Sequence, residues 1–270
     1  MPDTSAKRPR KGIAQVDKTP KARVKSGGIT NFAFDGLDIV SDVVSKFGPQ
    51  GDLLELFAAT EGVKVNKWHH YLPIHERYFG PWRDRKAPPR FLEIGVARGG
   101  SLSMWRRYFG PDAVIFGGDI NPDCAQYNGI NGQVRIGSQD EPDFLRSVVG
   151  EMSGVAVVLD DGSHQMHHVR ATLDILFPLL SVGGTYMIED LHTVCWPKFG
   201  GGLGAPENFF NFTRAAVDDL HHWSHASPRT HPEITAFLMG IHRHDSIVVL
   251  DTATVFRPTN SAVGPGPKRG

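Results

Sequence analysis

The chain has 270 residues, 40% hydrophobic and 21% charged, and its 29 basic and 29 acidic residues balance. This composition is ordinary for a globular protein in water and gives no reason to expect nucleic acid or an anionic membrane as a partner. Two distant cysteines and no apolar run near ~20 residues disfavour a disulfide framework, a zinc ribbon and a membrane span, so we expect a cytoplasmic protein.

The two ends of the chain differ from its middle. Residues 1–28 contain many Lys and Arg but almost no large apolar side chains, so burial cannot offset the entropy cost of ordering them. We expect a disordered basic tail there; an arm for a polyanionic partner is the alternative, which no other feature supports. Residues 259–270 are expected to form a second flexible tail.

A helical N-terminal segment is expected over residues 29–89, because apolar residues recur at helical spacing over residues 37–44 and 53–57. Within it, residues 67–71 read KWHHY and place two histidines between aromatic residues. Two interpretations remain open for this stretch: a packed aromatic cluster with hydrogen-bonding histidines, or a flap that faces the substrate. Residues 81–89 are polar and broken by prolines, and they precede the sheet domain, residues 90–258.

Short apolar segments that end in acidic residues organise this domain. They are residues 90–93, 113–119, 155–161 and 184–190. Segments of this kind are typical of buried parallel strands with amphipathic helices between them, which predicts an α/β fold. We also expect a short strand at residues 133–136 and an antiparallel edge hairpin from residues 246–250 and 254–256.

The acids at the strand ends mark the expected site, because ligands bind beyond the carboxyl ends of strands in an open α/β sheet. A rim built only for stability would not concentrate like charge in this way. The six acids are Glu93, Asp119, Asp160, Asp161, Glu189 and Asp190.

A glycine-rich turn, residues 95–101, follows the first strand and opens a helix. Gly95 lets the backbone approach a ligand, and the helix start near Ser101 offers free N–H groups. The G-x-G-x-x-G spacing of dinucleotide-binding folds is absent, and the acid before the turn, Glu93, would repel a pyrophosphate. A cationic nucleoside would not be repelled, so the turn points away from NAD and towards S-adenosylmethionine (SAM).

Further residues on the rim suit a nucleoside. Asp119 follows Glu93 at about the distance at which an acid accepts the two ribose hydroxyls; a cap of the Asn-Pro-Asp turn is the alternative. Gln139 can reach an adenine amino group. Asp160 and Asp161 are consecutive strand residues that face opposite ways, so we expect them to have different tasks.

His164 comes after Asp-Asp-Gly-Ser, at the expected start of a helix, from which its ring can project over the rim. With His167 and His168 it has the spacing of zinc ligands on one helix face. A rim rich in carboxylates suits a hard cation better than zinc, so zinc is the less favoured interpretation.

The sequences FLEIGVARGGSLSMW, GDI, VLDDGSH and MIEDLHT together resemble the class I SAM-dependent methyltransferases. Among these, the chain is most similar to the metal-dependent sugar O-methyltransferases of macrolide biosynthesis. The similarity covers roughly residues 66–256, and the DDGSH and ED motifs are its most specific parts. It implies a Rossmann-like sheet of seven strands, parallel except for the last, with helices on both faces.

The resemblance also implies a role for each rim residue. The Mg2+ ligands are Asp161, Glu189 and Asp190. The residues that bind SAM are Glu93, Gly95, Ser101, Asp119, Gln139 and Asp160. His164 is the general base that takes the proton of a sugar hydroxyl, which fits an imidazole with a pKa near neutrality. Members of the family assemble, so a homo-oligomer is implied.

The acceptor is less well defined, because residues 191–196, LHTVCW, depart from the aromatic-rich stretch of the family. A sugar on a glycoside, oligosaccharide or polysaccharide fits. The alternatives are a metal-dependent O-methyltransferase of a catechol or another small hydroxylated natural product, a non-catalytic SAM-binding accessory protein, and an NAD-linked oxidoreductase. The retained acids and His164 disfavour the accessory protein, and the missing glycine pattern disfavours the oxidoreductase.

Overall fold

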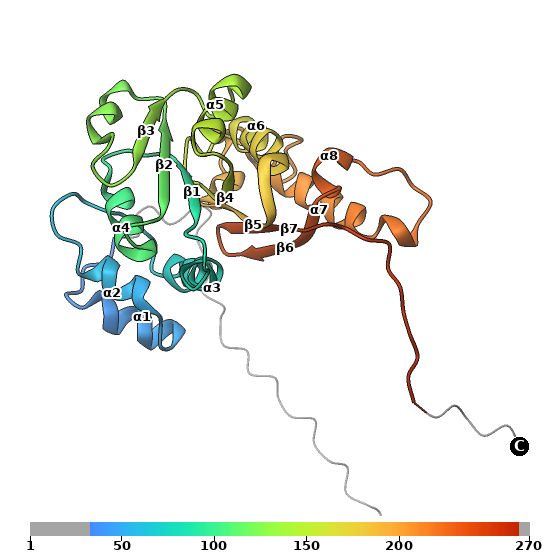
Figure 1. The fold of residues 1–270 in the computed structure, drawn as a ribbon, viewed down its shortest axis with the longest axis horizontal. Helices are drawn as coiled ribbons and strands as arrows, with labels where there is room; N and C mark the ends of the chain where they lie inside the picture. Colours follow the sequence, from blue (N-terminus) through green and yellow to red (C-terminus); the bar gives the residue numbers. More distant parts are fainter. Residues whose placement is uncertain (1–32, 265–270) are drawn as a thin grey trace, which may run out of the picture. The chain divides into compact units, whose positions relative to one another are not determined.

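A computed structural model of the chain describes residues 33–264 (Figure 1). The chain divides into two units, Met1–Leu37 and Asp38–Gly270, and every described helix and strand belongs to the second. The expected basic tail over residues 1–28 and the last six residues of the expected flexible tail lie outside the described residues. Within residues 33–264, none of the helices combines the length and the apolar character needed to cross a bilayer.

Seven strands form one mixed sheet. They are β1 (Arg90–Ile94), β2 (Val114–Asp119), β3 (Gln133–Ile136), β4 (Val155–Asp160), β5 (Leu180–Ile188), β6 (Leu238–His244) and β7 (Ile247–Thr252). Their order in space is β3-β2-β1-β4-β5-β7-β6 (Figure 1). The first five strands pair in parallel, whereas β7 is antiparallel to both neighbours. The expected Rossmann-like sheet, parallel except for its last strand, is confirmed.

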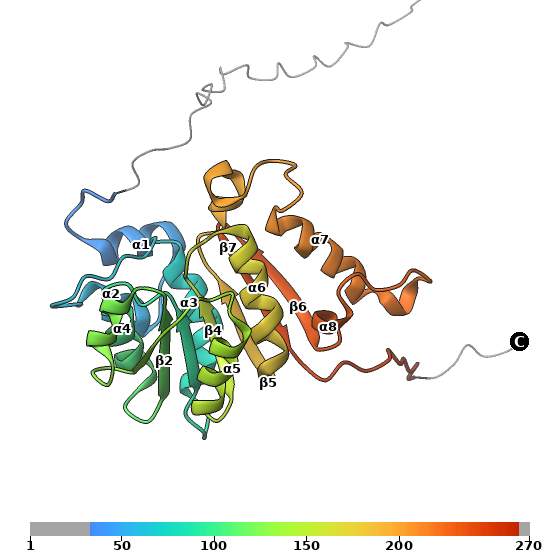
Figure 2. The same cartoon turned by 90° about the horizontal axis from the view of Figure 1, so that it is seen from above.

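Helices cover both faces of this sheet. The α-helices are α1 (Ile39–Phe47), α2 (Asp52–Ala58), α3 (Tyr71–Arg83), α4 (Gly100–Phe109), α5 (Pro142–Glu151), α6 (Met166–Leu176), α7 (Phe209–Leu220) and α8 (Pro232–Thr235). The 3-10 helices are η1 (Pro122–Tyr127), η2 (Phe177–Leu179), η3 (Leu191–Cys195), η4 (Pro197–Phe199) and η5 (His222–Ser224). One apolar core contains residues of α1 to α4, and the other contains residues of α5 to α8 (Figures 1 and 2).

The strands contribute alternately to the two cores, because successive strand residues point to opposite faces. In β1, Phe91 lies in the core with α1 to α4 and Leu92 in the other; Val157 and Val158 of β4 divide in the same way. The central strands are therefore apolar on both faces, which explains why they are continuous apolar runs in the sequence.

Strands β1 and β4 are neighbours, and from them the strand order runs outward in opposite directions. Their parallel register pairs Ile94 with Asp160, so the loops after both strands begin at the same level. Loops that leave a sheet at such a reversal diverge and leave a crevice between them. The topology thus places a crevice at the edge where the acids were expected.

The helical N-terminal segment is present, as α1, α2 and the longer α3. Asp38 begins α1, where its carboxylate accepts the backbone N–H of Ser41 at 2.9 Å, and Gly48 ends it with a φ of 80°. Helix α3 continues past Pro81 to Arg83, so the proline-containing stretch at residues 81–89 begins within the helix.

The edge hairpin differs from the one expected. It is built from β6 and β7, and residues 254–256 lie outside any strand, with Phe256 76% exposed. β7 matches the expected strand at residues 246–250. β6 gave no signal because it lies at the sheet edge, where Met239 and Arg243 are exposed and an apolar run is not required.

Gly95 joins β1 to the glycine-rich turn with a φ of 97°, a conformation that side chains other than glycine rarely adopt. Its N–H donates to the carbonyl of Gly118 at 2.8 Å, and a Cβ atom at this position would overlap the carbonyl oxygen of Asp161. The turn after β1 therefore touches the backbone after β4 at the edge of the crevice.

We predict that Gly95→Ala destabilises the fold far more than Gly200→Ala. Gly200 also has a positive φ, of 77°, but a Cβ atom there would make only ordinary contacts. Gly200→Ala should therefore lower the free energy of unfolding only by the strain of the left-handed backbone, about 1–2 kcal/mol. Gly95→Ala adds a backbone overlap and should cost at least about 2 kcal/mol more. Urea denaturation of both variants measures the difference, and equal costs would contradict the close approach.

Candidate functional site

A cavity of about 600 Å3 lies at the carboxyl ends of the strands. Its walls come from the turn after β1, the ends of β2 and β3, the loop after β4 and the segment before α3. The lining residues are 64–67, 94–98, 118–120, 137–139 and 161–164, with Gly100, Ser101, Phe144, His168 and Asp190. A volume of this size suits a ligand of several hundred daltons.

Gly95, Ser101, Asp119 and Gln139, all expected to bind the cofactor, line this cavity. The carboxylate of Asp119 accepts the backbone N–H groups of Val96 at 2.8 Å and Ala97 at 2.9 Å, so it also fixes the turn after β1. A carboxylate has about four lone-pair positions, and such an acid still has acceptor capacity for a ligand hydroxyl.

Glu93 and Asp160, the other expected cofactor residues, lie beneath the cavity and are buried at 0% and 2% exposure. Glu93 accepts hydrogen bonds from Ser101 Oγ at 2.7 Å and Trp105 Nε1 at 3.1 Å, both in α4. Asp160 accepts from Gln139 Nε2 at 3.2 Å. Burial raises the pKa of both carboxyls to about 7. The structure therefore brings four of the six expected cofactor residues to the cavity wall and places two behind it.

Asp161, Glu189 and Asp190 form the carboxylate cluster, at the ends of β4 and β5. Asp161 and Asp190 line the cavity, whereas the Glu189 side chain is 1% exposed and lies behind them. The outward turn of Asp190 follows from its left-handed backbone, with a φ of 55°. Such a conformation is uncommon for a residue with a side chain.

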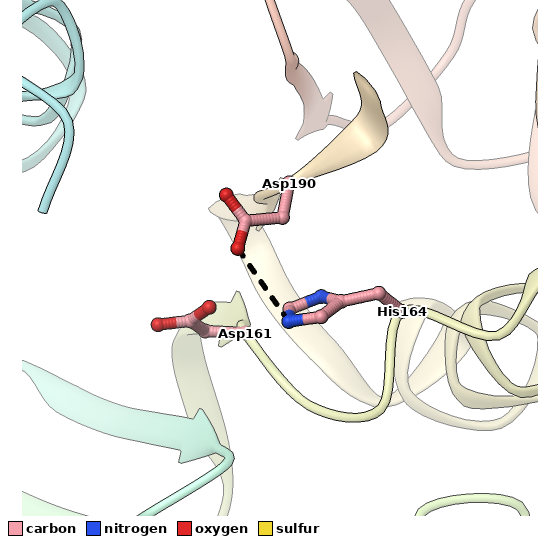
Figure 3. A group of neighbouring side chains, drawn as sticks. All are labelled: Asp161, His164 and Asp190. Atoms are coloured by element: carbon pink, nitrogen blue, oxygen red, sulfur yellow. Dashed lines mark ion pairs between the residues drawn. The ribbon is translucent and has the colours of Figure 1, made fainter. Parts of the chain in front are cut away.

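The ring of His164 points towards Asp161 and Asp190 of this cluster (Figure 3). Its Nε2 lies 3.5 Å from Asp190 Oδ2, and one ligand atom each from Asp161, His164 and Asp190 lies within 4.8 Å of the others. His164 has a left-handed φ of 58° and precedes α6, which begins at Met166, so it lies in the loop and not at the helix start as expected. Burial lowers the pKa of His164, although Asp190 opposes this effect, so the neutral ring is favoured near pH 7.

Three side chains whose contact with the acids the sequence did not predict hold the carboxylate cluster from the side of α3. Lys67 Nζ donates to Asp161 Oδ2 and to Glu189 Oε2, each at 2.6 Å. Tyr71 donates its hydroxyl to Asp190 Oδ1 at 2.7 Å, and His75 Nε2 pairs with Glu189 Oε1. The four-residue spacing of Lys67, Tyr71 and His75 is the one signal in the sequence for a shared face.

The stretch at residues 67–71 thus has a task that neither of its two interpretations named. Trp68 and His70 do belong to an aromatic cluster, with ring centroids 5.8 Å apart, but Lys67 and Tyr71 turn towards the acids. Because the segment before α3 also lines the cavity, the N-terminal helical segment is part of the site.

The donor set fits a divalent metal ion of the hard class. Asp161 and Asp190 offer carboxylate oxygens to one cavity, which are the ligands that Mg2+ prefers. In the predicted third ligand, Glu189, Oε2 accepts from Lys67, and Oε1 lies against His75 Nε2. A histidine set for zinc is not assembled: His168 Nδ1 bonds Ser163 Oγ at 2.8 Å and His167 is exposed.

Comparison with known proteins gives a consistent set of relatives, although no protein-family profile matches the chain. It is 36% identical over 217 residues to the 8-demethyl-8-(2-methoxy-alpha-L-rhamnosyl)-tetracenomycin-C 3'-O-methyltransferase of Streptomyces olivaceus, covering 74% of this chain and 54% of that one. It is 31% identical over 212 residues to the mycinamicin VI 2''-O-methyltransferase of Micromonospora griseorubida, covering 74% and 52%. The chain spans about half the length of the curated relatives it matches.

A solved structure of the methyltransferase MycE from the mycinamycin pathway, in complex with Mg, SAH and mycinamycin VI, superimposes with a TM-score of 0.67. The two chains are 29% identical, and the match covers 76% of this chain and 54% of MycE. The resemblance to sugar O-methyltransferases, inferred from the sequence, is confirmed by these comparisons, and so is the methyltransferase fold.

The buried carboxyl of Glu93 predicts a pH-dependent stability. Its pKa is raised from 4.5 to about 7 in the folded protein, so between these values the unfolded chain releases a proton that the folded chain keeps. The free energy of unfolding therefore falls as pH rises through this window, by roughly 3 kcal/mol for this group. In Glu93→Gln the amide oxygen accepts from Trp105 and the NH2 donates to Ser101, so the contribution disappears.

Urea denaturation of the wild type and Glu93→Gln at pH 5 and pH 8 tests this. Other groups titrate equally in both proteins, so the wild type should lose more stability than the variant between the two pH values. An identical loss in both would show that Glu93 is ionised throughout this range.

Proposed function

We propose that the protein is a SAM- and Mg2+-dependent O-methyltransferase that transfers a methyl group to a hydroxyl of a sugar. The observation that carries the proposal is one cavity that has the glycine-rich turn and Asp119 on one side and Asp161, His164 and Asp190 on the other. A methyl donor and an acceptor hydroxyl have to meet at such a junction. The named relatives, which methylate sugars on tetracenomycin and mycinamicin, support the same reaction class.

The turn after β1 and the ends of β2 and β3 are the nucleoside side of this cavity. Gly95 lets the backbone approach the nucleoside, and Ser101 lies at the start of α4. Asp119 provides an acceptor for the ribose hydroxyls, and Gln139 provides a polar side chain for adenine. Glu93 and Asp160 contribute from behind, because they fix Ser101 and Gln139 by hydrogen bonds.

Asp161 and Asp190 would hold the metal from the cavity side, with Glu189 as the third carboxylate of the set. When bound, SAM supplies an electrophilic methyl group and a divalent cation makes a neighbouring hydroxyl more acidic. The chain's own contribution is to fix the carboxylates on adjacent strand ends, so that the acceptor is oriented with little loss of entropy during the reaction.

His164 takes the proton of the acceptor hydroxyl at Nε2, the ring atom that faces the cluster. Its lowered pKa keeps the ring neutral at neutral pH, so that in the tautomer with the proton on Nδ1 the Nε2 atom can accept one, and Asp190 at 3.5 Å stabilises the imidazolium that forms. A protein that only bound SAM would have no use for this arrangement, which disfavours the accessory role.

We also infer that the enzyme works in the cytoplasm as a homo-oligomer. The two free cysteines, Cys124 and Cys195, are in keeping with a reducing compartment. The oligomer rests on the family resemblance, and size-exclusion chromatography with light scattering measures it directly.

Purified protein with SAM, Mg2+ and a panel of glycosides and oligosaccharides should yield a product heavier by one methyl group, located on a sugar oxygen by NMR. Chelation should abolish turnover and added Mg2+ should restore it, because the carboxylates alone do not acidify the hydroxyl. Full turnover in chelator would contradict the metal role, and methylation of catechols without any glycoside would contradict the sugar acceptor.

Replacing His164 with Ala should lower kcat by about 10²–10⁴-fold, the usual contribution of a general base, while SAM affinity stays within a factor of about three. His167→Ala is the matched control, because His167 is exposed on the same segment and should turn over like the wild type. Steady-state kinetics and calorimetric titration with SAM measure the two effects. Unchanged kcat in His164→Ala would assign that histidine a structural task.

A further inference from the structure

Lys67 has an unusual position for a lysine. Its side chain is 3% exposed, and it is the one buried lysine within residues 33–264. Lysines are almost never buried unless they are paired, because removal of an ammonium from water is costly. Lys67 meets this cost with two carboxylate partners, Asp161 and Glu189, each at 2.6 Å.

Both partners belong to the cluster assigned to the metal. The sequence positions are remote, since Lys67 lies 94 residues before Asp161 and 122 before Glu189, so the contact is formed only by the fold. Lys67 also lines the cavity, and its ammonium bonds both Glu189, in the buried part of the cluster, and Asp161, in the open part.

A metal ion would compete with this ammonium for oxygen atoms of the same carboxylates. Carboxylates at the ends of β4 and β5 repel one another, and each positive charge placed among them relieves that repulsion. Lys67 already relieves it at Asp161 Oδ2 and Glu189 Oε2. A second cation that approaches Asp161 is repelled by the ammonium and finds one of its ligand oxygens occupied.

We infer that Lys67 is a built-in cation that competes with the divalent metal ion for the carboxylate cluster. It keeps Asp161 and Glu189 together in the metal-free protein and gives up at least Asp161 Oδ2 when the metal binds. This inference rests on the proposed function only in taking the cluster as the metal site. Lys67 is a positioning residue in this role, because it acts on the metal ligands.

The competition predicts that loss of the ammonium strengthens metal binding. Lys67→Met, which keeps an apolar stem of similar length, and Lys67→Gln, which keeps a hydrogen-bond donor, should each bind Mn2+ at least tenfold more tightly than the wild type. Electron paramagnetic resonance of free Mn2+ gives these affinities without any acceptor or turnover, and Mg2+ should displace the bound Mn2+.

Lys64→Met is the matched control. Lys64 lines the same cavity from the same segment but is exposed, so loss of its charge should change Mn2+ affinity by less than threefold. Adding Asp190→Asn to Lys67→Met should remove the gained affinity, which assigns it to the carboxylate cluster. A lysine with only a structural task predicts the opposite sign, because a loosened cluster binds metal more weakly.

Thermal unfolding provides a second test of the competition between Lys67 and the metal ion. Without metal, Lys67→Met should unfold at a lower temperature than the wild type, because Asp161 and Glu189 then lack their ammonium partner. Mg2+ should raise its midpoint by more than it raises that of the wild type.

If neither variant folds, the wild type still tests the inference. A buried, hydrogen-bonded ammonium exchanges its protons slowly enough to give a 15N-lysine NMR signal, which Mg2+ should shift or remove. Unchanged or weakened Mn2+ affinity in a folded Lys67 variant, or an ammonium signal indifferent to Mg2+, would overturn the inference. Absence of Mn2+ binding in every protein would overturn the metal role as well, whereas normal binding with no Lys67 effect would leave the proposed function intact.

Discussion

Repulsion among Asp161, Glu189 and Asp190 is the constraint under which the site is built. β4 and β5 pair in parallel with Asp160 beside Ile188, so the acids that follow the two strands lie side by side. They cannot separate without disruption of the sheet, and unpaired charges in a partly buried place are costly. Positive charge and hydrogen-bond donors therefore have to come from elsewhere in the chain, and they come from α3 and the residues just before it.

The position of these donors depends on how α3 packs. Phe79 of α3 lies against Phe91 of β1 and Trp105 of α4, with ring centroids 5.8 and 5.4 Å apart. The ring centroids of Trp105 and His75 are 5.5 Å apart, and Trp105 donates a hydrogen bond to Glu93. A single aromatic core thus fixes both the glycine-rich turn and the face of α3 that meets the carboxylate cluster, which couples the nucleoside side of the cavity to the acidic side.

The strand pattern of the sequence predicted most of this architecture, because buried parallel strands are apolar on both faces and their acids stand at the ends. It did not predict Lys67, Tyr71 and His75 as partners of the acids. Their spacing indicates one helix face, but what that face meets is decided by contacts across about a hundred residues. The edge strand β6 was missed for a simpler reason: a half-exposed strand needs no apolar run.

The sequence does not show how deeply each of the six acids at the strand ends is buried. The buried acids are Glu93, Asp160 and Glu189. The acids that line the cavity are Asp119, Asp161 and Asp190. Alternation along β4 predicts that Asp160 and Asp161 face opposite ways, but it does not say which side is open.

The division into buried acids and acids that line the cavity differs from the division by ligand that the resemblance implied. The resemblance assigned Glu93, Asp160 and Asp119 to SAM, and Glu189 to the metal ion. Each buried acid bonds a side chain that does line the cavity; these are Ser101, Gln139 and Lys67, respectively. A buried acid can therefore affect a bound molecule through the residue that it orients. Because a hydrogen bond in a poorly solvated place is strong, the inner acids hold these wall residues in position, while the outer acids face the cavity.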